Sequence, residues 1–363
     1  MISFRNHEKT NMSFGPGITI IWGENGSGKT SILEAIHSLS FGTSFRTNNK
    51  KELIKQGSNN FLLEGFFKNK KGNKNTVFFS QDTKGNKKIK INKKEIQKRK
   101  DLLGINNVVV FSPEEEAITK NGPNNRRKFF NKVFSIVSKK YLEDLLNYNA
   151  ILQQRNAVLK LGSKKNINKQ IDIWNKPFSE KAEKLWKQRK KLFVDFSEVF
   201  KETVKTLGLG IDCDISYGQN KISKKEILKS LEKNKETEAL LGFTTKGPHK
   251  DEFLFKWGGR TIRKHGSQGE HKMFLALLKT TELLFISKKT KRTPVFLIDD
   301  IFANLDLNRS KRLLRFVEKL RLQEKTKPQT IITATDILEV QKEGFFSNYS
   351  KIIKHKLRVN ETP

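Results

Sequence analysis

The segment GENGSGKTSILEAIH, residues 23–37, decides the fold class of this chain. It directly follows a short apolar run, ITIIW (18–22), and its second half has the composition of a helix. The spacing Gly23-x4-Gly28-Lys29-Thr30 matches the phosphate-loop pattern in the strand–loop–helix context that the pattern requires. Glycines let backbone N–H groups close around phosphates, and a helix N-terminus adds partial positive charge. The segment predicts a polyphosphate site built from Gly23, Glu24, Asn25, Gly26, Ser27, Gly28, Lys29 and Thr30.

A second segment completes this site. The phosphate-loop pattern of residues 23–30 is known as Walker A. In it, Lys29 is expected to reach the β- and γ-phosphates of ATP, and Thr30 to ligate Mg²⁺. VFLIDD (295–300) is an apolar strand that ends in two carboxylates, as the Walker B partner does. Asp299 is expected to hold the Mg²⁺ shell, and Asp300 to orient or polarise the attacking water. ATP and Mg²⁺ are therefore the expected cofactors, with Lys29 and Asp300 as catalytic residues.

The charge of the chain is extreme. Its 363 residues carry 72 Lys+Arg against 38 Asp+Glu, a formal net charge of +34. Such an excess favours a polyanionic partner, nucleic acid first. Lys and Asn are also abundant in loops such as NKKGNKN (69–75), which a genome-wide bias toward A·T-rich codons explains equally well. The charge is thus compatible with DNA binding without establishing it.

Other features exclude several classes of protein. Cys213 is the only cysteine, so neither a disulfide framework nor a zinc knuckle is possible within the chain. The N-terminus MISFRNHEKT lacks the apolar stretch of a signal peptide, and no run of eighteen apolar residues occurs. These features predict a cytoplasmic protein without a membrane span.

The hydrophobic period changes along the chain. Period-two or apolar runs predict strands at 18–22, 61–67, 75–80, 88–92 and 108–111, and again at 211–217, 251–262, 295–299 and 330–335. Between them, SPEE (112–115) is typical of a helix start, with Ser112 as the cap, Pro113 at the first helical position and Glu115 placed for a capping box. Apolar residues then recur every three or four positions from Phe130 to Leu152 and from Leu185 to Leu207, with Arg189 on the second stripe. Further helices are expected after Ser223, at 267–287 and at 305–321.

The simplest architecture is α/β. A P-loop ATPase head with a mixed or parallel sheet and a β-rich subdomain would comprise residues 1–111 and 209–363. A helical lobe, residues 112–208, would be inserted into it.

The motifs distinguish among classes of P-loop protein. No Asn-Lys-x-Asp element of a GTPase is present, and a small kinase would be shorter and carry an Arg-rich lid. Ser267-Gln268-Gly269-Glu270 instead precedes the helical run HKMFLALLKTTELLF and resembles the signature motif of the ABC-type ATPases. ANLD (303–306) resembles their D-loop, with Asp306 as its acidic residue. In that class, the signature Ser267, Gln268 and Gly269 would meet the γ-phosphate held by a second subunit, so two heads would sandwich two ATP molecules.

Over nearly its whole length, the chain resembles the RecF family of bacterial recombination proteins. The motifs occur in the family's order: FRNHE (4–8), SFRT (44–47), FSPEEEAITKNGPNNRRKFFN (111–131), GPHKD (247–251), SQGEHK (267–272), IDDIFANLD (298–306) and TIITATD (330–336). Glu116, Ala117, Phe130-Asn131 and Glu270 depart from the family's usual residues. Glu270 adds a negative charge to a phosphate-facing loop, where it would weaken the sandwich or point away from it.

This resemblance implies a function in replication, recombinational repair and the SOS response. It implies an ATP-dependent homodimer on duplex or gapped DNA, a RecR-like partner, and help in forming RecA filaments at gaps. Most ABC-type ATPases carry Glu where Asp300 stands, and the shorter Asp predicts slow hydrolysis that acts as a switch. The resemblance also implies that DNA stimulates this hydrolysis. Thr333 or Thr335 stands where a switch His is usual.

The DNA contacts expected from the sequence are basic. Arg46, Arg126, Arg127 and the Lys-rich segment 84–100 are the candidates, and they would track phosphates with little sequence information. Arg126 and Arg127 are alternatively a protein-binding patch.

Two other functions stay open on the residues alone. One is a soluble ABC-type ATPase that gates a protein complex, with incidental DNA binding. The other is a P-loop phosphotransferase acting on a small acceptor, which the signature and D-loop motifs argue against.

Overall fold

The structure, a computed structural model, describes residues 1–68, 72–161, 167–218, 223–300, 328–335 and 352–357. The chain forms two compact units: unit 1 comprises Met1–Glu116 and Leu275–Pro363, and unit 2 comprises Ala117–Phe274. Residues 209–274, which the sequence analysis assigned to the head, thus belong to the same unit as the predicted helical lobe. The functional division into two lobes stays a prediction.

A parallel sheet carries the phosphate loop in unit 1. Within the described residues its strand order is β14-β3-β13-β12-β8, and every neighbouring pair is parallel. Sheets of this kind are covered on both faces, so their strands are continuous apolar runs; β8 and β13 are buried at every residue. The strands are β3 (Ile18–Trp22), β8 (Val108–Phe111), β12 (Val295–Ile298), β13 (Thr330–Ala334) and β14 (Ile352–Lys356).

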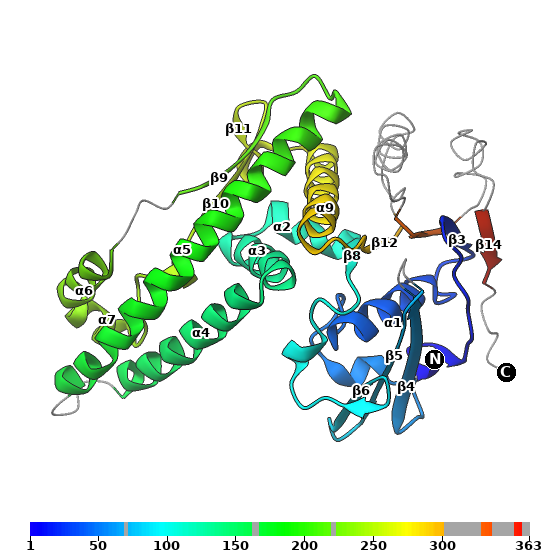
Figure 1. Cartoon of the computed structure of the whole chain (residues 1–363), viewed down its shortest axis with the longest axis horizontal. Coiled ribbons are helices and arrows are strands. Elements are labelled where there is room, and N and C mark those ends of the chain that lie inside the picture. Colours follow the sequence, from blue (N-terminus) through cyan, green and yellow to red (C-terminus); the bar gives the residue numbers. More distant parts are fainter. Residues whose placement is uncertain (69–71, 162–166, 219–222, 301–327, 336–351, 358–363) are drawn as a thin grey trace. The chain divides into compact units, whose positions relative to one another are not determined.

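A second sheet of unit 1 is antiparallel, with the order β2-β1-β4-β5-β6-β7 in the described residues. Helix α1 (Lys29–Phe41) contacts β4 and β5 of this sheet and β13 and β8 of the parallel one (Figure 1). Phe61 packs edge-to-face on Phe4 and Phe79, with ring centroids 5.2 and 5.1 Å apart. The strands are β1 (Ile2–Phe4), β2 (His7–Lys9), β4 (Asn60–Lys68), β5 (Lys74–Asp82), β6 (Lys87–Ile91) and β7 (Lys94–Glu95), with 3₁₀ turns η1 (Lys50–Leu53) and η2 (Arg99–Leu102).

The segment after β8 differs from its prediction. It forms a 3₁₀ turn, η3 (Pro113–Glu116), before the short helix α2 (Ala117–Lys120). The Ser112 hydroxyl makes no hydrogen bond to the described residues; the Glu115 N–H donates to the Ser112 carbonyl instead. The Glu115 carboxylate lies 2.7 Å from the buried Lys279 ammonium of helix α9 (Gln268–Thr290). An ion pair to α9 therefore replaces the capping box expected here.

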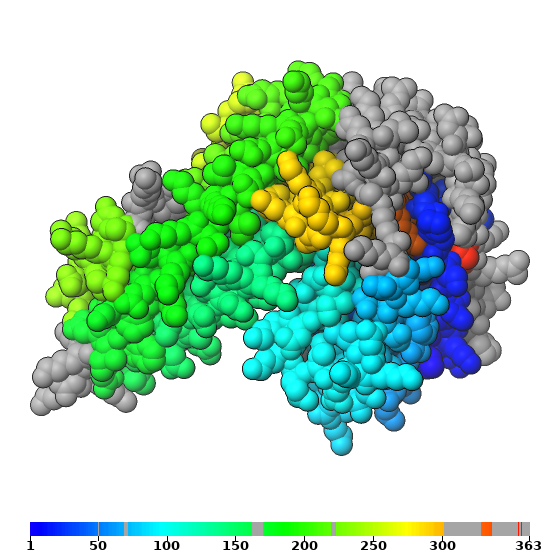
Figure 2. Space-filling view, viewed as in Figure 1, coloured from blue at the N-terminus to red at the C-terminus, as the bar shows by residue number. Residues whose placement is uncertain are grey.

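Long helices dominate unit 2. The apolar stripe from Phe130 to Leu152 runs over two helices, α3 (Pro123–Val137) and α4 (Lys139–Lys160), because the chain is extended at Ser138, whose hydroxyl caps α4. Helix α5 (Ile167–Leu207) packs along α4 (Figure 1). The short helices α6 (Lys224–Lys233) and α7 (Lys235–Leu241) lie at the end of this pair where α4 ends and α5 begins (Figures 1 and 2). Ser223 caps α6, where a helix was predicted to begin, and Glu226 completes a capping box with it.

A three-stranded antiparallel sheet completes the described part of unit 2. Its order is β11-β10-β9, with β9 (Cys213–Tyr217), β10 (Phe253–Trp257) and β11 (Arg260–Thr261). The 3₁₀ turn η4 (Pro248–Lys250) precedes β10, and helix α8 (Ile262–His265) follows β11. Phe130 of α3 packs on Phe253 of β10 with ring centroids 4.2 Å apart, and Phe193 of α5 also contacts both rings. Aromatic packing thus joins this sheet to the helices.

Two buried arginines organise polar networks in unit 2. Arg189 on α5 pairs with the Asp251 carboxylate and donates to the Pro248 carbonyl at 2.7 Å. Arg155 on α4 lies 2.7 Å from the Glu238 carboxylate of α7 and donates to the Thr244 hydroxyl. Buried charges are costly unless they are paired and hydrogen-bonded, so these networks fix which elements pack together.

Candidate functional site

The phosphate loop joins β3 to α1 as the sequence predicted. Gly23, Gly26 and Gly28 have φ values of 151°, 85° and 92°, in the left-handed region that side chains disfavour. Gly28 is the N-cap of α1, so the helix begins where the phosphates are expected. The Ser27 hydroxyl is buried in the loop without a hydrogen-bond partner among the described residues. A loop of this shape, with an unsatisfied donor inside it, fits a polyphosphate.

Lys29 lies across the loop. Its ammonium donates to the carbonyls of Gly23 at 2.7 Å and Glu24 at 2.8 Å. Burial lowers the pKa of the Lys29 ammonium, and the nearby carboxylates of Asp300 and Asp299 oppose that change. The ammonium is therefore held near both acidic residues, inside the loop, where it would neutralise the phosphates of a bound nucleotide.

At the acidic end of the site, several hydrogen bonds meet at Asp299. Strand β13 separates β3 from β12, so the carboxyl ends of all three strands meet at one edge. The Asp299 carboxylate accepts hydrogen bonds from the hydroxyls of Thr30 at 2.9 Å and Thr333 at 2.7 Å. The Asp300 N–H donates to the same Thr333 hydroxyl at 3.0 Å. Residues 30, 299 and 333, far apart in sequence, thus form one connected group.

This group fits a magnesium site. Asp299 is 4% exposed, and burial raises the pKa of its carboxyl against the two hydroxyl hydrogen bonds. A divalent cation would compensate a carboxylate buried in this way. Mg²⁺ typically takes one or two protein ligands plus phosphate oxygens and water. The described residues contain no group of three or more His, Cys, Asp or Glu that could by itself hold a metal ion.

Asp300 is held in an unusual backbone conformation. Its φ is 43°, which is strained for a residue with a side chain. Strain of this kind persists only where the surroundings impose it, and the hydrogen bond from the Asp300 N–H to Thr333 does so. Thr333 therefore contacts both acidic residues, and Thr335 directly follows the last residue of β13.

The signature segment begins α9 within unit 2. Ser267 and Gln268 are exposed, and Gly269 is buried. The Glu270 carboxylate accepts from the Ser267 N–H at 2.7 Å, and the Glu270 N–H donates to the Ser267 hydroxyl at 3.4 Å. Glu270 thus forms a capping box with Ser267. Its carboxylate is thereby held at the N-terminus of its own helix, and its effect on the sandwich stays a prediction.

The basic candidates for DNA contacts differ in exposure. Arg126 is 3% exposed and donates to the Asn121 carbonyl, and Arg127 donates to the Asp251 carbonyl. Arg46, more exposed, lies 3.4 Å from the Glu114 carboxylate and 3.9 Å from that of Glu34. The lysines of segment 84–100 are mostly exposed on β6 and β7 and in the adjacent turns. Their contact with DNA stays a prediction, with segment 84–100 the most accessible.

Two residues beside the phosphate loop were not singled out as site residues. The side chains of Asn6 and His7 both contact loop carbonyls. The FRNHE motif was the available signal, but nothing in its spacing from the loop indicated a contact. Asp306 and the predicted helix at 305–321 lie outside the described residues.

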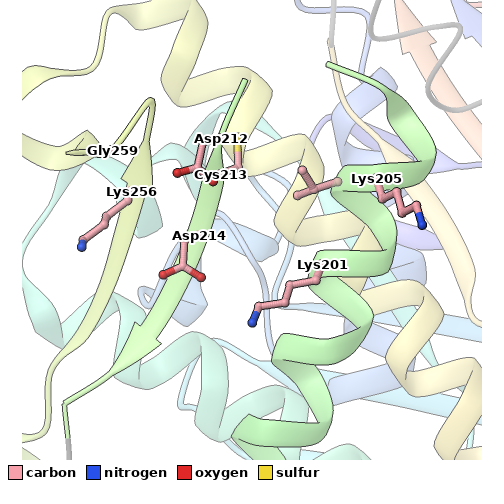
Figure 3. Close-up of a pocket in the computed structure, with 8 residues that line it drawn as sticks. Lys201, Lys205, Asp212, Cys213, Asp214, Lys256 and Gly259 are labelled. Atoms are coloured by element: carbon pink, nitrogen blue, oxygen red, sulfur yellow. The ribbon is translucent and has the colours of Figure 1, made fainter. Parts of the chain in front are cut away.

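A groove in unit 2 lies away from the predicted site residues. It has a volume of about 460 Å³ and is lined by Lys201, Lys205, Asp212, Cys213, Asp214 and Lys256 (Figure 3). Burial raises the pKa of the Cys213 thiol to about 12, so this cysteine is an inert thiol at neutral pH. The groove contains none of the predicted site residues. No helix in the described part of the chain has the length and apolar character to span a membrane.

Comparison with known proteins identifies the family of this chain. Residues 1–356 match the family described as RecF/RecN/SMC N terminal domain. The DNA replication and repair protein RecF of Clostridium botulinum is 35% identical over 347 residues, which cover 94% of this chain and 93% of that protein. The RecF of Azobacteroides pseudotrichonymphae is 32% identical, covering 93% and 90%.

Solved structures give the same answer. A structure of the recombination mediator protein RecF with ATP, from the RecFOR pathway, is similar with a TM-score of 0.81 and 29% identity, covering 92% of this chain and 90% of that one. The Smc head domain of Pyrococcus furiosus matches at a TM-score of 0.57 and 18% identity, covering 98% and 92%, and shows a shared fold only. The expected ABC-type α/β fold is thereby confirmed. The chain belongs to the RecF family of ATP-binding DNA replication and repair proteins.

Proposed function

We propose that this chain is an ATP-gated DNA clamp of recombinational repair. Two copies would enclose two Mg-ATP molecules, with Ser267, Gln268 and Gly269 of each copy against the γ-phosphate at Lys29 of the other. The hydrogen-bonded group of Thr30, Asp299 and Thr333 at the end of the phosphate loop carries the proposal. It supplies the donor set for Mg²⁺ and links that set to the backbone of Asp300.

The signature segment supports the dimer. Ser267 and Gln268 are exposed at the start of a long helix, where N–H groups and the helix dipole attract anions. The capping box leaves the Glu270 carboxylate occupied with the Ser267 N–H, so its charge is partly compensated before a phosphate approaches.

Asp300 sets the expected rate. Its carboxylate is one methylene shorter than the Glu of most ABC-type ATPases, so a water on the γ-phosphate would be oriented less well. Slow hydrolysis would then determine how long the dimer stays closed, rather than drive movement. We further propose that bound DNA accelerates this step.

The partners follow from charge and family. The net charge of +34 and the exposed lysines of segment 84–100 favour phosphate tracking on duplex or gapped DNA. The chain's relatives are replication and repair proteins, and a similar structure is of a recombination mediator in the RecFOR pathway. We therefore propose a RecR-like partner and help in RecA filament formation at gaps, which requires a cytoplasmic location.

Light scattering tests the clamp. Molar mass is measured for Asp300→Asn with and without Mg-ATP, because slow or absent hydrolysis should trap the closed form. A doubling of mass only with Mg-ATP is expected, and Lys29→Ala, which should not bind ATP, is the control. A mass that ATP leaves unchanged, also in the presence of a duplex oligonucleotide, contradicts the clamp.

A second experiment tests DNA binding. Fluorescence anisotropy of a labelled duplex is followed over a salt series, with and without Mg-ATP. Tighter binding with ATP at every salt concentration is expected. Equal affinity in both conditions would instead favour an ATPase that gates a protein complex, with DNA binding due to charge alone.

A further inference from the structure

Side chains of the N-terminal hairpin contact the phosphate loop on its outer side. Strands β1 and β2 are joined by a tight turn at Arg5 and Asn6, and Arg5 has a φ of 55°. From this turn the Asn6 amide donates to the Gly26 carbonyl at 2.9 Å. The next side chain, His7, has its Nε2 atom 3.0 Å from the Gly28 carbonyl. Two consecutive side chains thus bind two carbonyls of the loop.

The geometry defines the tautomer of His7. A carbonyl only accepts hydrogen bonds, so Nε2 must carry the proton that it donates to Gly28. Nδ1 then accepts from the Thr10 hydroxyl, 3.0 Å away. Burial lowers the pKa of the His7 imidazole, which keeps the ring neutral at physiological pH. His7 is therefore a fixed donor aimed at the loop.

The hairpin is anchored independently of these contacts. The Arg5 guanidinium makes a two-pronged bond to Glu34 of α1, at 2.8 and 2.7 Å. Glu34 is fully buried and also accepts from the Ser44 hydroxyl. Paired guanidinium–carboxylate bonds of this kind fix orientation as well as distance. Arg5 thus holds the hairpin at the helix that the loop begins.

The contact is close enough to constrain the loop. A Cβ atom added at Gly28 would collide with the His7 ring and stand 2.7 Å from the Asn6 amide oxygen. In a trans peptide, the C=O of one residue and the N–H of the next point in opposite directions. The Gly28 carbonyl accepts from the His7 ring and also from the Ile32 N–H of α1 at 3.3 Å, so it is fixed from two sides and the Lys29 N–H points in the opposite direction. Asn6 fixes the tip of the loop, where the Ser27 N–H donates to Glu24 within the turn.

We propose that Asn6 and His7 are positioning residues for the nucleotide: they hold the carbonyl side of the phosphate loop so that its N–H side is set for phosphates before ATP arrives. The inference rests on the ATP site proposed above. It applies to the β-phosphate region, which ATP and ADP share, and not to the γ-phosphate or the dimer.

Nucleotide titrations on single variants test it. Affinities for Mg-ATP and Mg-ADP are measured by calorimetry for wild type, Asn6→Ala, His7→Ala and His7→Gln. Loss of one neutral hydrogen bond corresponds to about threefold to tenfold in affinity. Asn6→Ala and His7→Ala should weaken both nucleotides by this factor, and His7→Gln, whose amide can still donate, should restore part of it. In turnover assays, KM should rise while kcat stays unchanged.

Glu8→Ala is the matched control. Glu8 lies on the same hairpin, its side chain is 81% exposed, and it faces Lys55 rather than the loop. Its nucleotide affinity should stay within about twofold of wild type, below the change of about threefold or more expected for a lost hydrogen bond. Since Asn6 is exposed, Asn6→Ala should fold normally and keep the test valid if His7→Ala does not.

The outcomes separate this inference from the clamp. If wild type binds ATP and both Ala variants bind it equally well, the positioning role is wrong while the clamp stands. If wild type binds ATP without doubling its mass and the Ala variants lose affinity, the clamp is wrong and the positioning role stands. A lower unfolding midpoint with unchanged affinity would show a purely structural hairpin.

Discussion

Replacing Asp299 by Asn should separate the stability of the protein from its response to ATP. Thr30 and Thr333 donate to the same carboxylate oxygen, and the amide oxygen of Asn can accept both hydrogen bonds. What the substitution removes is a negative charge that is 4% exposed. Burial raises the pKa of this carboxyl, so the folded protein binds a proton more tightly than the unfolded chain. Above both pKa values, the ionised group therefore lowers the stability of the free protein.

The expected magnitudes differ for the two states. Without ligand at pH 7, the free energy of unfolding of Asp299→Asn should lie within about 1 kcal/mol of the wild-type value or exceed it. The hydrogen bonds remain and the buried charge is gone. Mg-ATP at one hundred times its dissociation constant stabilises a protein by about 2.7 kcal/mol. For folding units of about 150–250 residues this raises the midpoint by roughly 5–10 °C. The variant should lose most of this shift with Mg-ATP.

Thermal unfolding with and without Mg-ATP measures both effects. Asp300→Asn is the matched control, because it neutralises the adjacent carboxylate, which does not accept these hydroxyl hydrogen bonds, and should keep the ATP-induced shift. A full shift in Asp299→Asn would place Mg²⁺ elsewhere and refute the site. A large loss of stability without ligand would refute the account of the hydrogen bonds.

Three further predictions concern other parts of the chain. Ser267→Arg should bind ATP normally but show no ATP-dependent doubling of mass in light scattering, because the bulk lies on the exposed signature segment; doubling would contradict the shared site. Asp251→Ala should cost about 3–5 kcal/mol in urea unfolding, since it leaves the Arg189 charge buried and unpaired; a cost below about 1 kcal/mol would disprove the pair. Burial lowers the pKa of His249 to about 4, so up to about 3 kcal/mol of stability should be lost as pH falls from about 6.5 to 4, and a His249→Gln variant should lack this loss.

The phosphate loop could be predicted because its chemistry is local. Eight consecutive residues carry the pattern, and the strand and helix beside them are visible in the same window. The strands could be predicted for a similar reason, since buried parallel strands are plain apolar runs. Thr333 and Thr335 were both candidates for the switch residue. The register that pairs Thr333 with Ile21 of β3, with β12 alongside, explains why Thr333 reaches Asp299, and the switch role stays a prediction.

The buried arginines show where prediction from sequence stops. Arg126 lies in a run of polar and basic residues, where an exposed, solvated side chain is the usual outcome. Its burial depends on Asn121 and on Phe255, whose ring lies 5.7 Å from the guanidinium. Contacts across 129 positions of sequence, from 126 to 255, leave no mark in local periodicity. Arg189 did leave one, as a charged residue on an apolar stripe, but its partner could not be named.

The GPHKD motif acquires a physical explanation from that partner. Asp251 accepts hydrogen bonds from Arg189, from the Trp186 indole at 2.8 Å and from the Tyr217 hydroxyl. Gly247, with a φ of 143°, lets the chain turn into this pocket. The motif is therefore a structural joint between α5, β9 and the start of β10, distinct from the phosphate-binding residues.

This joint has a consequence for the proposed clamp. Strand β10 begins two residues after Asp251 and leads through β11 and α8 directly to Ser267. The carboxylate that fixes the start of β10 to the long helix α5 therefore also fixes the base from which the signature segment extends. If the helices α4 and α5 moved relative to this segment, the fully buried ion pair would have to break, which is strongly destabilising. Within unit 2, we expect the helices α4 and α5 and the signature segment to move as one body, so that anything bound to these helices would act directly on the segment that we propose closes over ATP.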